Sequence, residues 1–105
     1  MTINTEMPVR VVAITQVAEK VKRFRFERLD GLPMPIFSGG AHVVVGMRDG
    51  GVLRRNPYSL MSPPTDTSGY EISVLRVEQS RGGSAFLHEK LKVGDQLTVS
   101  QPVNL

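Results

Sequence analysis

The chain has 105 residues, enough for one domain with one hydrophobic core but too few for a large α/β barrel or for a dinucleotide-binding domain joined to a substrate domain. Apolar residues make up 40% of the chain and it contains ten glycines, a composition typical of globular domains that excludes a disordered chain. The net charge is +3 with no dense basic run, and the lack of cysteine excludes disulfides, zinc–thiolate sites and an iron–sulfur cluster held by this chain.

The first ten residues lack the apolar segment of a signal peptide. Elsewhere no apolar run approaches the roughly 18 residues that a membrane span needs. We therefore expect a cytoplasmic protein that does not associate with membranes.

The first third of the chain predicts two strands. Residues 9–17 are rich in β-branched side chains and predict a strand buried on much of both faces. Residues 22–28 alternate, which turns Phe24 and Phe26 inward. Residues 30–35 then break the chain and begin an irregular connection to residue 40.

The middle of the chain predicts a hairpin. Residues 42–47 and 52–60 are apolar runs separated by Asp49-Gly50, a pair that favours a tight turn, although Pro57 interrupts the second run. Residues 62–69 form a turn-rich loop.

The last third predicts a strand, a helix and a strand. Residues 70–77 form a strand whose apolar phase slips between Val74 and Leu75, which predicts a bulge or burial on both faces. Ser84 can cap a helix over residues 85–91, and residues 93–99 give a turn and a final strand. The chain is therefore expected to be all-β, with six short antiparallel strands in a small barrel and one short helix before the last strand.

The chain ends at Leu105, an apolar residue with no polar tail after it. Natural termini more often fray into polar residues. We therefore expect a fragment of a longer protein.

The two histidines, His42 and His88, do not suggest catalysis or metal binding. Neither stands at metal-ligand spacing from another ligand, and no nucleophile–base arrangement is visible. We expect His42 to be structural at a strand edge, and His88 to be solvated or a local hydrogen-bond partner. No metal site is expected.

Two segments suggest a ligand that carries both a flat ring and a phosphate. In residues 54–60, Tyr58 and Ser59 beside arginines offer an aromatic plane, a hydroxyl and a cation. In residues 80–84, two glycines before a helix allow close backbone approach to an anion. Taken alone, each segment has a plainer reading, as a half-buried strand and as a capped helix after a flexible turn. Their combination is the more specific feature.

These segments carry a resemblance to a known family. Residues 40–43, 56–60, 70–74, 81–88 and 93–97 in this order resemble the flavin-binding domain of the ferredoxin–NADP reductase superfamily. The resemblance is strongest to the branch of phthalate dioxygenase reductase, vanillate demethylase reductase and carnitine monooxygenase reductase. It implies an N-terminal tail over residues 1–7 and a flavin-binding barrel over residues 8–105, as a six-stranded antiparallel Greek-key barrel.

The resemblance also implies roles for individual residues. Tyr58 would lie against the flavin ring and Ser59 near its redox-active N5 edge, as the two residues closest to the chemistry, with Leu60 beside them. The backbone of Val74, Leu75 and Arg76 would line the other side of the flavin. The phosphate would be held at the start of the helix, by Gly82, Gly83 and Ser84.

The cofactor implied is FMN, with FAD as the alternative used more widely in the superfamily. Longer members of this branch add a nicotinamide-binding domain and a [2Fe–2S] domain, and pass electrons from NAD(P)H to a Rieske-type oxygenase component. This chain would then hold the flavin and be inactive alone, because NAD(P)H and [2Fe–2S] would bind in other domains.

One position departs from the family pattern. Where the family usually has arginine two residues before the tyrosine, this chain has Asn56, and Arg55 stands one step further back. In a regular strand Arg54, Asn56 and Tyr58 share a face and Arg55 points away. We expect Pro57 to disturb the strand so that Arg55 reaches the phosphate while Asn56 assists at the ring or ribityl chain.

Two other classes remain open. A single-stranded nucleic-acid-binding barrel of the OB type fits the length and the arginine content, but requires several exposed aromatic side chains. The other is a barrel that binds no small ligand and serves only for interaction. In that case residues 54–60 would be an ordinary half-buried strand and residues 80–84 an ordinary turn before a capped helix.

Overall fold

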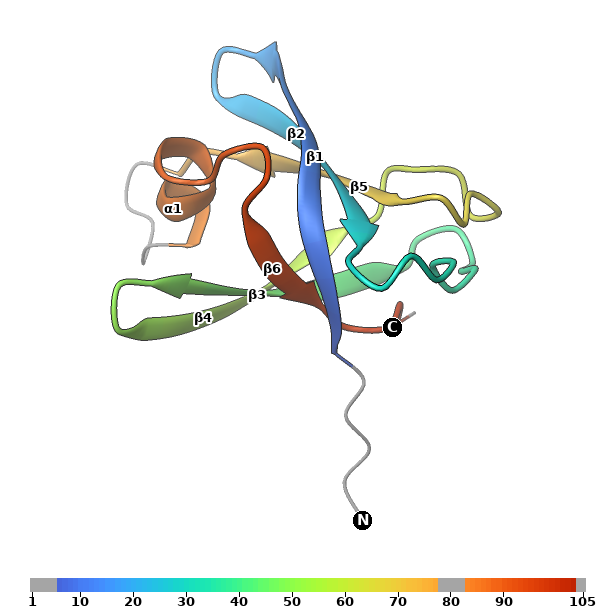
Figure 1. Ribbon diagram of the computed structural model, residues 1–105. Coiled ribbons are helices and arrows are strands. Elements are labelled where there is room, and N and C mark those ends of the chain that lie inside the picture. Colours follow the sequence, from blue (N-terminus) through green and yellow to red (C-terminus); the bar gives the residue numbers. More distant parts are fainter. Residues whose placement is uncertain (1–5, 78–82, 104–105) are drawn as a thin grey trace.

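The computed structural model describes residues 6–77 and 83–103, and in this part six strands form one antiparallel sheet with a single short helix (Figure 1). The order of strands across the sheet is β4-β3-β6-β1-β2-β5. The elements are β1 (Met7–Ala18), β2 (Val21–Arg28), β3 (His42–Asp49), β4 (Val52–Ser59), β5 (Tyr70–Leu75), α1 (Gly83–Glu89) and β6 (Gln96–Val99).

The sheet has Greek-key connectivity. Strands β1 and β2 pair as neighbours in sequence, as do β3 and β4, whereas β6 returns to lie between β1 and β3. Strand β5 pairs with β2 at the far edge. The expected all-β architecture, with the helix directly before the last strand, is confirmed. The sheet curls into a barrel that hydrogen bonds do not fully close, because β4 and β5 are its two edges.

Alternating side chains build the core. Phe24 and Phe26 are fully buried as predicted, because the period of a strand turns every second residue to the same face. Between β2 and β3, the loop places Met34 in the core, and the Tyr70 hydroxyl donates to the Pro35 carbonyl beneath it. The largest fully buried side chains are Tyr70, Phe24, Phe26, Met34, Met47, Ile72, Leu87, Val9, Val11, Val43, Val45 and Val74.

Strands β1 and β5 differ from the sequence expectation. In β1 the buried residues alternate with exposed ones, so the strand is buried on one face rather than two, and register shifts fall after Val11 and Gln16. The register of β5 against β2 is unbroken, so it has no bulge. Val74 is buried and Leu75 is exposed because Leu75 continues the alternation onto the outer face.

The predicted hairpin forms between β3 and β4. Gly50 has φ of +62°, a left-handed conformation that residues with a Cβ rarely adopt. This turn explains why the Asp49-Gly50 pair predicted the hairpin correctly.

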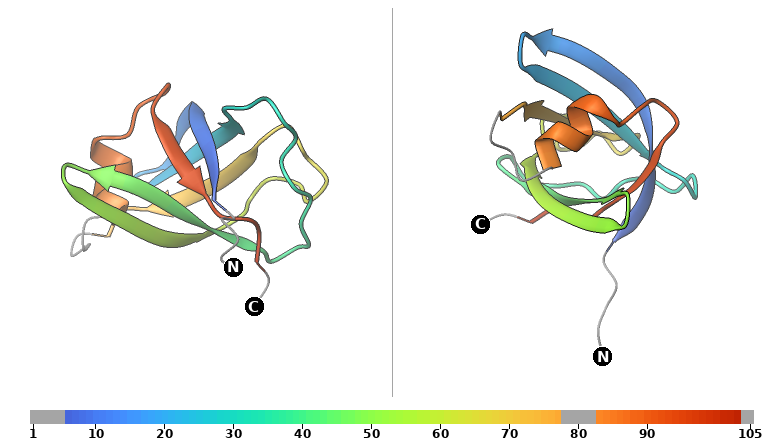
Figure 2. Two further views of the ribbon diagram at one scale, coloured as in Figure 1. Left: turned by 60° about the horizontal axis from the view of Figure 1, so that its bottom comes forward. Right: turned by 90° about the vertical axis from the view of Figure 1, so that its left-hand side faces the viewer.

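Helix α1 lies across one end of the barrel (Figure 2, right). It begins at Gly83 and ends at Glu89, slightly earlier than predicted. Ser84 lies within the helix instead of capping it, and its buried hydroxyl accepts a hydrogen bond from the Val77 N–H at 3.2 Å. Among the described residues, no helix is long and apolar enough to cross a membrane.

Candidate functional site

The inner face of β4 is polar where the rest of the barrel is apolar. Arg54, Asn56 and Tyr58 alternate along the strand and are half-buried. Their partners across the β3–β4 ladder are the buried residues Met47, Val45 and Val43. Because directly opposed residues share a face, the three β4 side chains point inward. Polar side chains in core positions indicate a function other than packing.

These side chains lie beside the seam, which we define as the stretch between β4 and β5 beyond the Leu60–Ile72 bridge. That bridge and a 2.8 Å hydrogen bond from the Met61 N–H to the Glu71 carbonyl join the two edges at one end. Because the Leu60 N–H donates to Ala41 on the β3 side, the bridge is made by the Met61 bond and by a second flanking bond, from the Ser73 N–H to the Ser59 carbonyl. Beyond Ser73, the described parts of β4 and β5 are not neighbours in the sheet pairing.

The seam exposes backbone hydrogen-bonding groups of β5. The Arg76 N–H donates to the Lys20 carbonyl on the β2 side, whereas the Glu71 carbonyl accepts from the β4 side. Backbone groups alternate along a strand, so the N–H and C=O of Ser73 and Leu75 point into the seam. The Ser73 N–H is used in the bridge to Ser59, whereas Leu75 lies beyond the last β4–β5 bridge of the described residues. Open backbone groups of this kind can pair with a polar ligand edge.

Tyr58 is the aromatic side chain beside the seam. Its ring packs against the core, and its Oη accepts a long hydrogen bond of 3.5 Å from Asn56 Nδ2. Burial raises the pKa of Tyr58 above its ordinary value, and the Asn56 contact opposes the shift. Tyr58 therefore keeps its proton near neutral pH and offers an uncharged aromatic surface.

Arg54 is held at the helix side of the seam by Asp49. Arg54 Nε lies 3.2 Å from Asp49 Oδ2, and Lys90 Nζ, just after α1, lies 2.8 Å from Asp49 Oδ1. The hydrogen bond from Lys90, and with it the one from Arg54, holds the pKa of Asp49 below its usual range. Asp49 thus connects the β3–β4 hairpin to the helix.

A buried histidine anchors the helix to β5. His88 Nε2 donates to the Val74 carbonyl at 2.7 Å, and its ring meets Phe24 edge-on with centroids 6.5 Å apart. Lys22 Nζ donates to the His88 carbonyl at 2.7 Å. His88 is therefore buried and bonded across the fold, neither solvated nor a local partner as expected. His42 is structural at the start of β3, as expected, where it exchanges backbone hydrogen bonds with Val103.

The structure places Arg55 on the opposite face from Tyr58. Arg55 is exposed and pairs with Glu6, with Nη2 3.1 Å from Oε1. The β3–β4 register runs unbroken through Pro57, so the strand keeps its alternation. The expected disturbance at Pro57 does not occur, and Arg55 does not reach Asn56 and Tyr58.

The other residues singled out around the ring come together at the seam. Ser59 ends β4 with its side chain exposed, and Leu60 forms the bridge that closes one end. On β5, Val74 is buried and Leu75 is 56% exposed. Arg76 follows and pairs with Glu89 of the helix.

The residues singled out for the phosphate are only partly described. Gly82 lies outside the described residues. Gly83 begins α1, and Ser84 is buried behind it. Helix α1 contacts both β4 and β5, and the Val77 N–H donates to Ser84 just beyond the end of β5.

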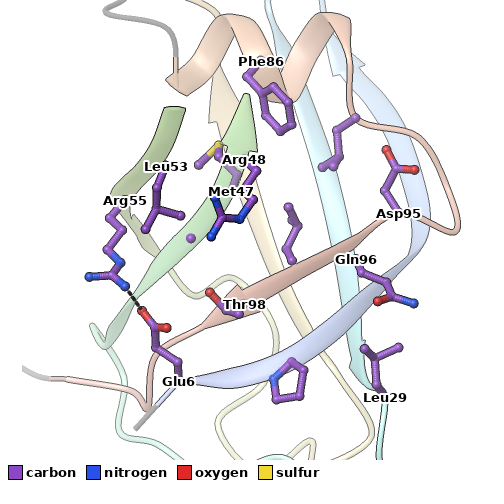
Figure 3. Close-up of a pocket in the computed structure, with 14 residues that line it drawn as sticks. Glu6, Leu29, Met47, Arg48, Leu53, Arg55, Phe86, Asp95, Gln96 and Thr98 are labelled. Atoms are coloured by element: carbon purple, nitrogen blue, oxygen red, sulfur yellow. Dashed lines mark ion pairs between the residues drawn. The ribbon is translucent and has the colours of Figure 1, made fainter. Parts of the chain in front are cut away.

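A separate pocket of about 580 Å³ lies on the outer face of the barrel, between β4, β3, β6 and β1 (Figure 3). The Arg55–Glu6 ion pair forms one wall, and Phe86 of the helix lies at the opposite end. Tyr58 and Asn56 do not line this pocket. We call it the outer-face pocket and distinguish it from the seam.

Neither a metal site nor an aromatic platform is present in residues 6–77 and 83–103. No group of three or more potential metal ligands occurs there. All six aromatic side chains are buried or half-buried, which argues against the stacked bases of a nucleic-acid barrel. They are Phe24, Phe26, Phe37, Tyr58, Tyr70 and Phe86.

Sequence reasoning missed three features of the site. These are the position of Arg54, the backbone of Leu75 beyond the last β4–β5 bridge, and the unbroken strand through Pro57. Alternation along β4 was the signal for the first and third, because it places Arg54 with Tyr58 and keeps Arg55 away.

Known proteins share this sequence and fold, although no protein-family model matches the chain. The carnitine monooxygenase reductase subunit of Escherichia coli is 53% identical over 97 residues, which cover 92% of this chain and 30% of that protein. The heme-dependent oxidative N-demethylase beta subunit of Ectopseudomonas mendocina is 45% identical over 102 residues, or 97% of this chain and 32% of that protein.

Among solved structures, phthalate dioxygenase reductase superposes with a TM-score of 0.87 at 28% identity, covering 95% of this chain and 30% of that chain. Its description is a modular structure for electron transfer from pyridine nucleotides to [2Fe–2S]. The chain therefore spans about a third of the length of the relatives it matches.

Proposed function

We propose that this chain, which belongs to the ferredoxin–NADP reductase-like flavin-binding domains, holds one flavin along the β4–β5 seam. The observation that carries the proposal is the open seam itself, where polar inner-face residues of β4 face unpaired backbone groups of β5. A flavin supplies the acceptance of a hydride and the release of single electrons. The chain's part is to bind and orient it.

The residues at the seam fit the ring of a flavin. An isoalloxazine has flat apolar faces and one edge that carries N–H and carbonyl groups. Tyr58 offers an uncharged aromatic surface for a ring face, and exposed Leu75 offers apolar cover. The N–H and C=O groups of Leu75, which lie beyond the last β4–β5 bridge, match the polar edge in kind.

We place Ser59 at the redox-active edge of the ring, because it follows Tyr58 directly and its backbone faces the seam. Leu60 closes that end. Val74 and Arg76 flank Leu75 on the same wall of the seam, with their backbone N–H groups directed toward β2.

At the phosphate end we assign the cation to Arg54 instead of Arg55. Arg54 shares the inner face with Asn56 and Tyr58, whereas Arg55 pairs with Glu6 on the other side of the strand. Asn56 then assists at the ribityl chain. Gly82, Gly83 and Ser84 complete the phosphate end, where a phosphate gains from backbone N–H groups.

FMN is the flavin we propose, with FAD as the alternative. The resemblance to the phthalate dioxygenase reductase branch supports FMN. A single phosphate at the helix end would satisfy Arg54 without requiring room for a second nucleotide.

The longer protein is proposed to be the reductase component of a Rieske-type oxygenase system. Its nicotinamide-binding domain would deliver electrons from NAD(P)H to the flavin, and a [2Fe–2S] domain would pass them to the oxygenase component. The names of the relatives, and the electron transfer described for phthalate dioxygenase reductase, support this assignment. We place the protein in the cytoplasm, where reduced nicotinamides are produced.

Titration of FMN with the purified chain tests the proposal. FMN fluorescence is expected to be quenched with one flavin bound per chain. Tyr58→Ala should weaken binding about 5- to 150-fold, because stacking of a flat ring on an aromatic side chain contributes about 1–3 kcal/mol.

Leu53→Ala is the matched control, since Leu53 lies on the same strand with its side chain exposed. It should leave FMN affinity within about twofold. Equal losses in the two variants would contradict a ring stacked on Tyr58, and a folded chain that leaves FMN fluorescence unchanged would contradict flavin binding altogether.

A further inference from the structure

Two neighbouring antiparallel edge strands that are joined at one end usually pair along the rest of their length. The described strands β4 and β5 do not, and this requires a physical reason. Leu60 opposes Ile72, and Met61 donates to the Glu71 carbonyl, so the register is already set. Carried forward, that register would place Ser59 opposite Ser73 and Pro57 opposite Leu75.

The direction of the backbone N–H groups identifies which β4 residues would have to donate hydrogen bonds to β5 for the seam to close. The Leu60 N–H donates to Ala41 on the β3 side, and the Met61 N–H donates toward β5. By alternation, residues 59, 57 and 55 direct their backbone groups toward β5. Proline at position 57 has no N–H, so it cannot donate to the Leu75 carbonyl in the pair that would close the seam.

Pro57 does not distort its own strand. Its ladder with β3 is unbroken on both sides, with Val44 as its partner. The N–H that Pro57 lacks would therefore have pointed only toward the seam. At such a position on an edge strand, proline blocks further strand pairing without loss of the fold.

We propose that Pro57 is a positioning residue that stops β4–β5 pairing after Ser73 and keeps the seam open, so that the backbone of Leu75 stays available to the ligand. The proposal rests on the proposed flavin site for its functional meaning. The claim that Pro57 keeps the seam open concerns the ligand-free chain and does not depend on the flavin site.

Amide hydrogen exchange, followed by NMR in the absence of flavin, tests the structural claim. In the wild-type chain the Leu75 amide should exchange much faster than the Ser73 amide, which donates to Ser59, and than the Ile72 and Val74 amides, which face β2. In Pro57→Val, residue 57 regains its N–H and has high strand propensity. The Leu75 amide should then be protected at least tenfold more than in wild type.

The second readout is FMN affinity. Pro57→Val should weaken FMN binding about tenfold, because the ligand must reopen a seam that is closed most of the time. Pro57→Ala, with lower strand propensity, should show the same changes to a smaller extent and provides a second variant should the valine chain fold poorly. Pro33→Ala, in the exposed loop after β2, is the control for loss of a proline and should change neither readout.

The outcomes separate the two proposals. A wild-type Leu75 amide as protected as that of Val74, or no added protection of Leu75 in both Pro57 variants, would overturn the role of Pro57 whatever the flavin affinity. Failure of the wild-type chain to bind FMN, with the exchange pattern as expected, would overturn the proposed flavin site and leave the open seam established.

Discussion

Replacing Arg54 and Arg55 one at a time separates the two faces of β4. The side chain of Arg54 is 26% exposed and lies on the inner face beside Asp49, and that of Arg55 is 55% exposed and pairs with Glu6 on the outer face. Arg54→Gln and Arg55→Gln are therefore the same chemical change at adjacent positions. Only the first should remove a cation from the proposed phosphate end.

The size of the effect follows from the hydrogen bond to phosphate that the substitution removes. A hydrogen bond to a charged group contributes about 1.5–3 kcal/mol, so Arg54→Gln should weaken FMN binding about 10- to 150-fold. The Arg55–Glu6 pair is an exposed ion pair worth up to about 1 kcal/mol of stability. Arg55→Gln should therefore leave FMN affinity within about twofold.

Riboflavin, which lacks the phosphate, completes the assay. Fluorescence titrations with FMN and riboflavin should show the weaker binding of Arg54→Gln with FMN only, because the ring and ribityl contacts are unchanged. Asp49 keeps Lys90 in this variant, and denaturant unfolding checks that the fold survives. Weaker binding specific to FMN in Arg55→Gln but not in Arg54→Gln would refute the assignment.

Three further predictions concern stability and titration. His88→Phe keeps the ring beside the core but removes the 2.7 Å hydrogen bond to Val74, so the free energy of unfolding should fall by about 1 kcal/mol; an unchanged denaturation midpoint would argue against this anchor. The pKa of Asp49 is lowered in the folded chain by Lys90, so the stability that its charge contributes is present above about pH 4 and disappears as the pH falls through the lowered value. Asp49→Asn should therefore destabilise the chain at pH 7 and progressively less toward pH 2, and a difference independent of pH would contradict the linkage. Burial raises the pKa of Tyr70 to about 12, so the ultraviolet absorbance of Tyr70→Phe should lack the tyrosinate step near that pH that the wild-type chain shows.

The sequence predicted the architecture well because its signals are local. Alternation in residues 22–28 and the Asp49-Gly50 turn are decided within a few residues, and both are present. The motifs around Tyr58 and Ser84 identified the flavin-binding relatives, and the resemblance is confirmed by the sequence and structural matches.

Features that depend on contacts between distant residues were predicted less well. His88 is buried because β5 and β2 present the Val74 carbonyl and the Phe24 ring to it, and nothing near His88 in the sequence encodes these contacts. Leu75 was read as a sign of a bulge, whereas it is an exposed residue at the seam. This exposed apolar side chain breaks the alternation of apolar inner and polar outer residues that core packing alone would give.

Arg55 illustrates a different error. Strict alternation correctly separates Arg54, Asn56 and Tyr58 from Arg55, but the family pattern of an arginine near the tyrosine led to the expectation that Pro57 would bend the strand. Pro57 lies on an edge where its missing N–H costs no ladder bond, so the strand has no reason to bend.

NMR chemical-shift mapping of the chain with FMN tests the central claim most directly, because the seam and the outer-face pocket are separate regions with different residues. The account predicts that shifts on FMN addition cluster at the seam, at Ser59, Ser73 and Leu75, and leave the outer-face pocket around Gly46 and Thr98 unchanged. Shifts confined to the outer-face pocket, or no shifts in a folded chain, would contradict a flavin held between β4 and β5.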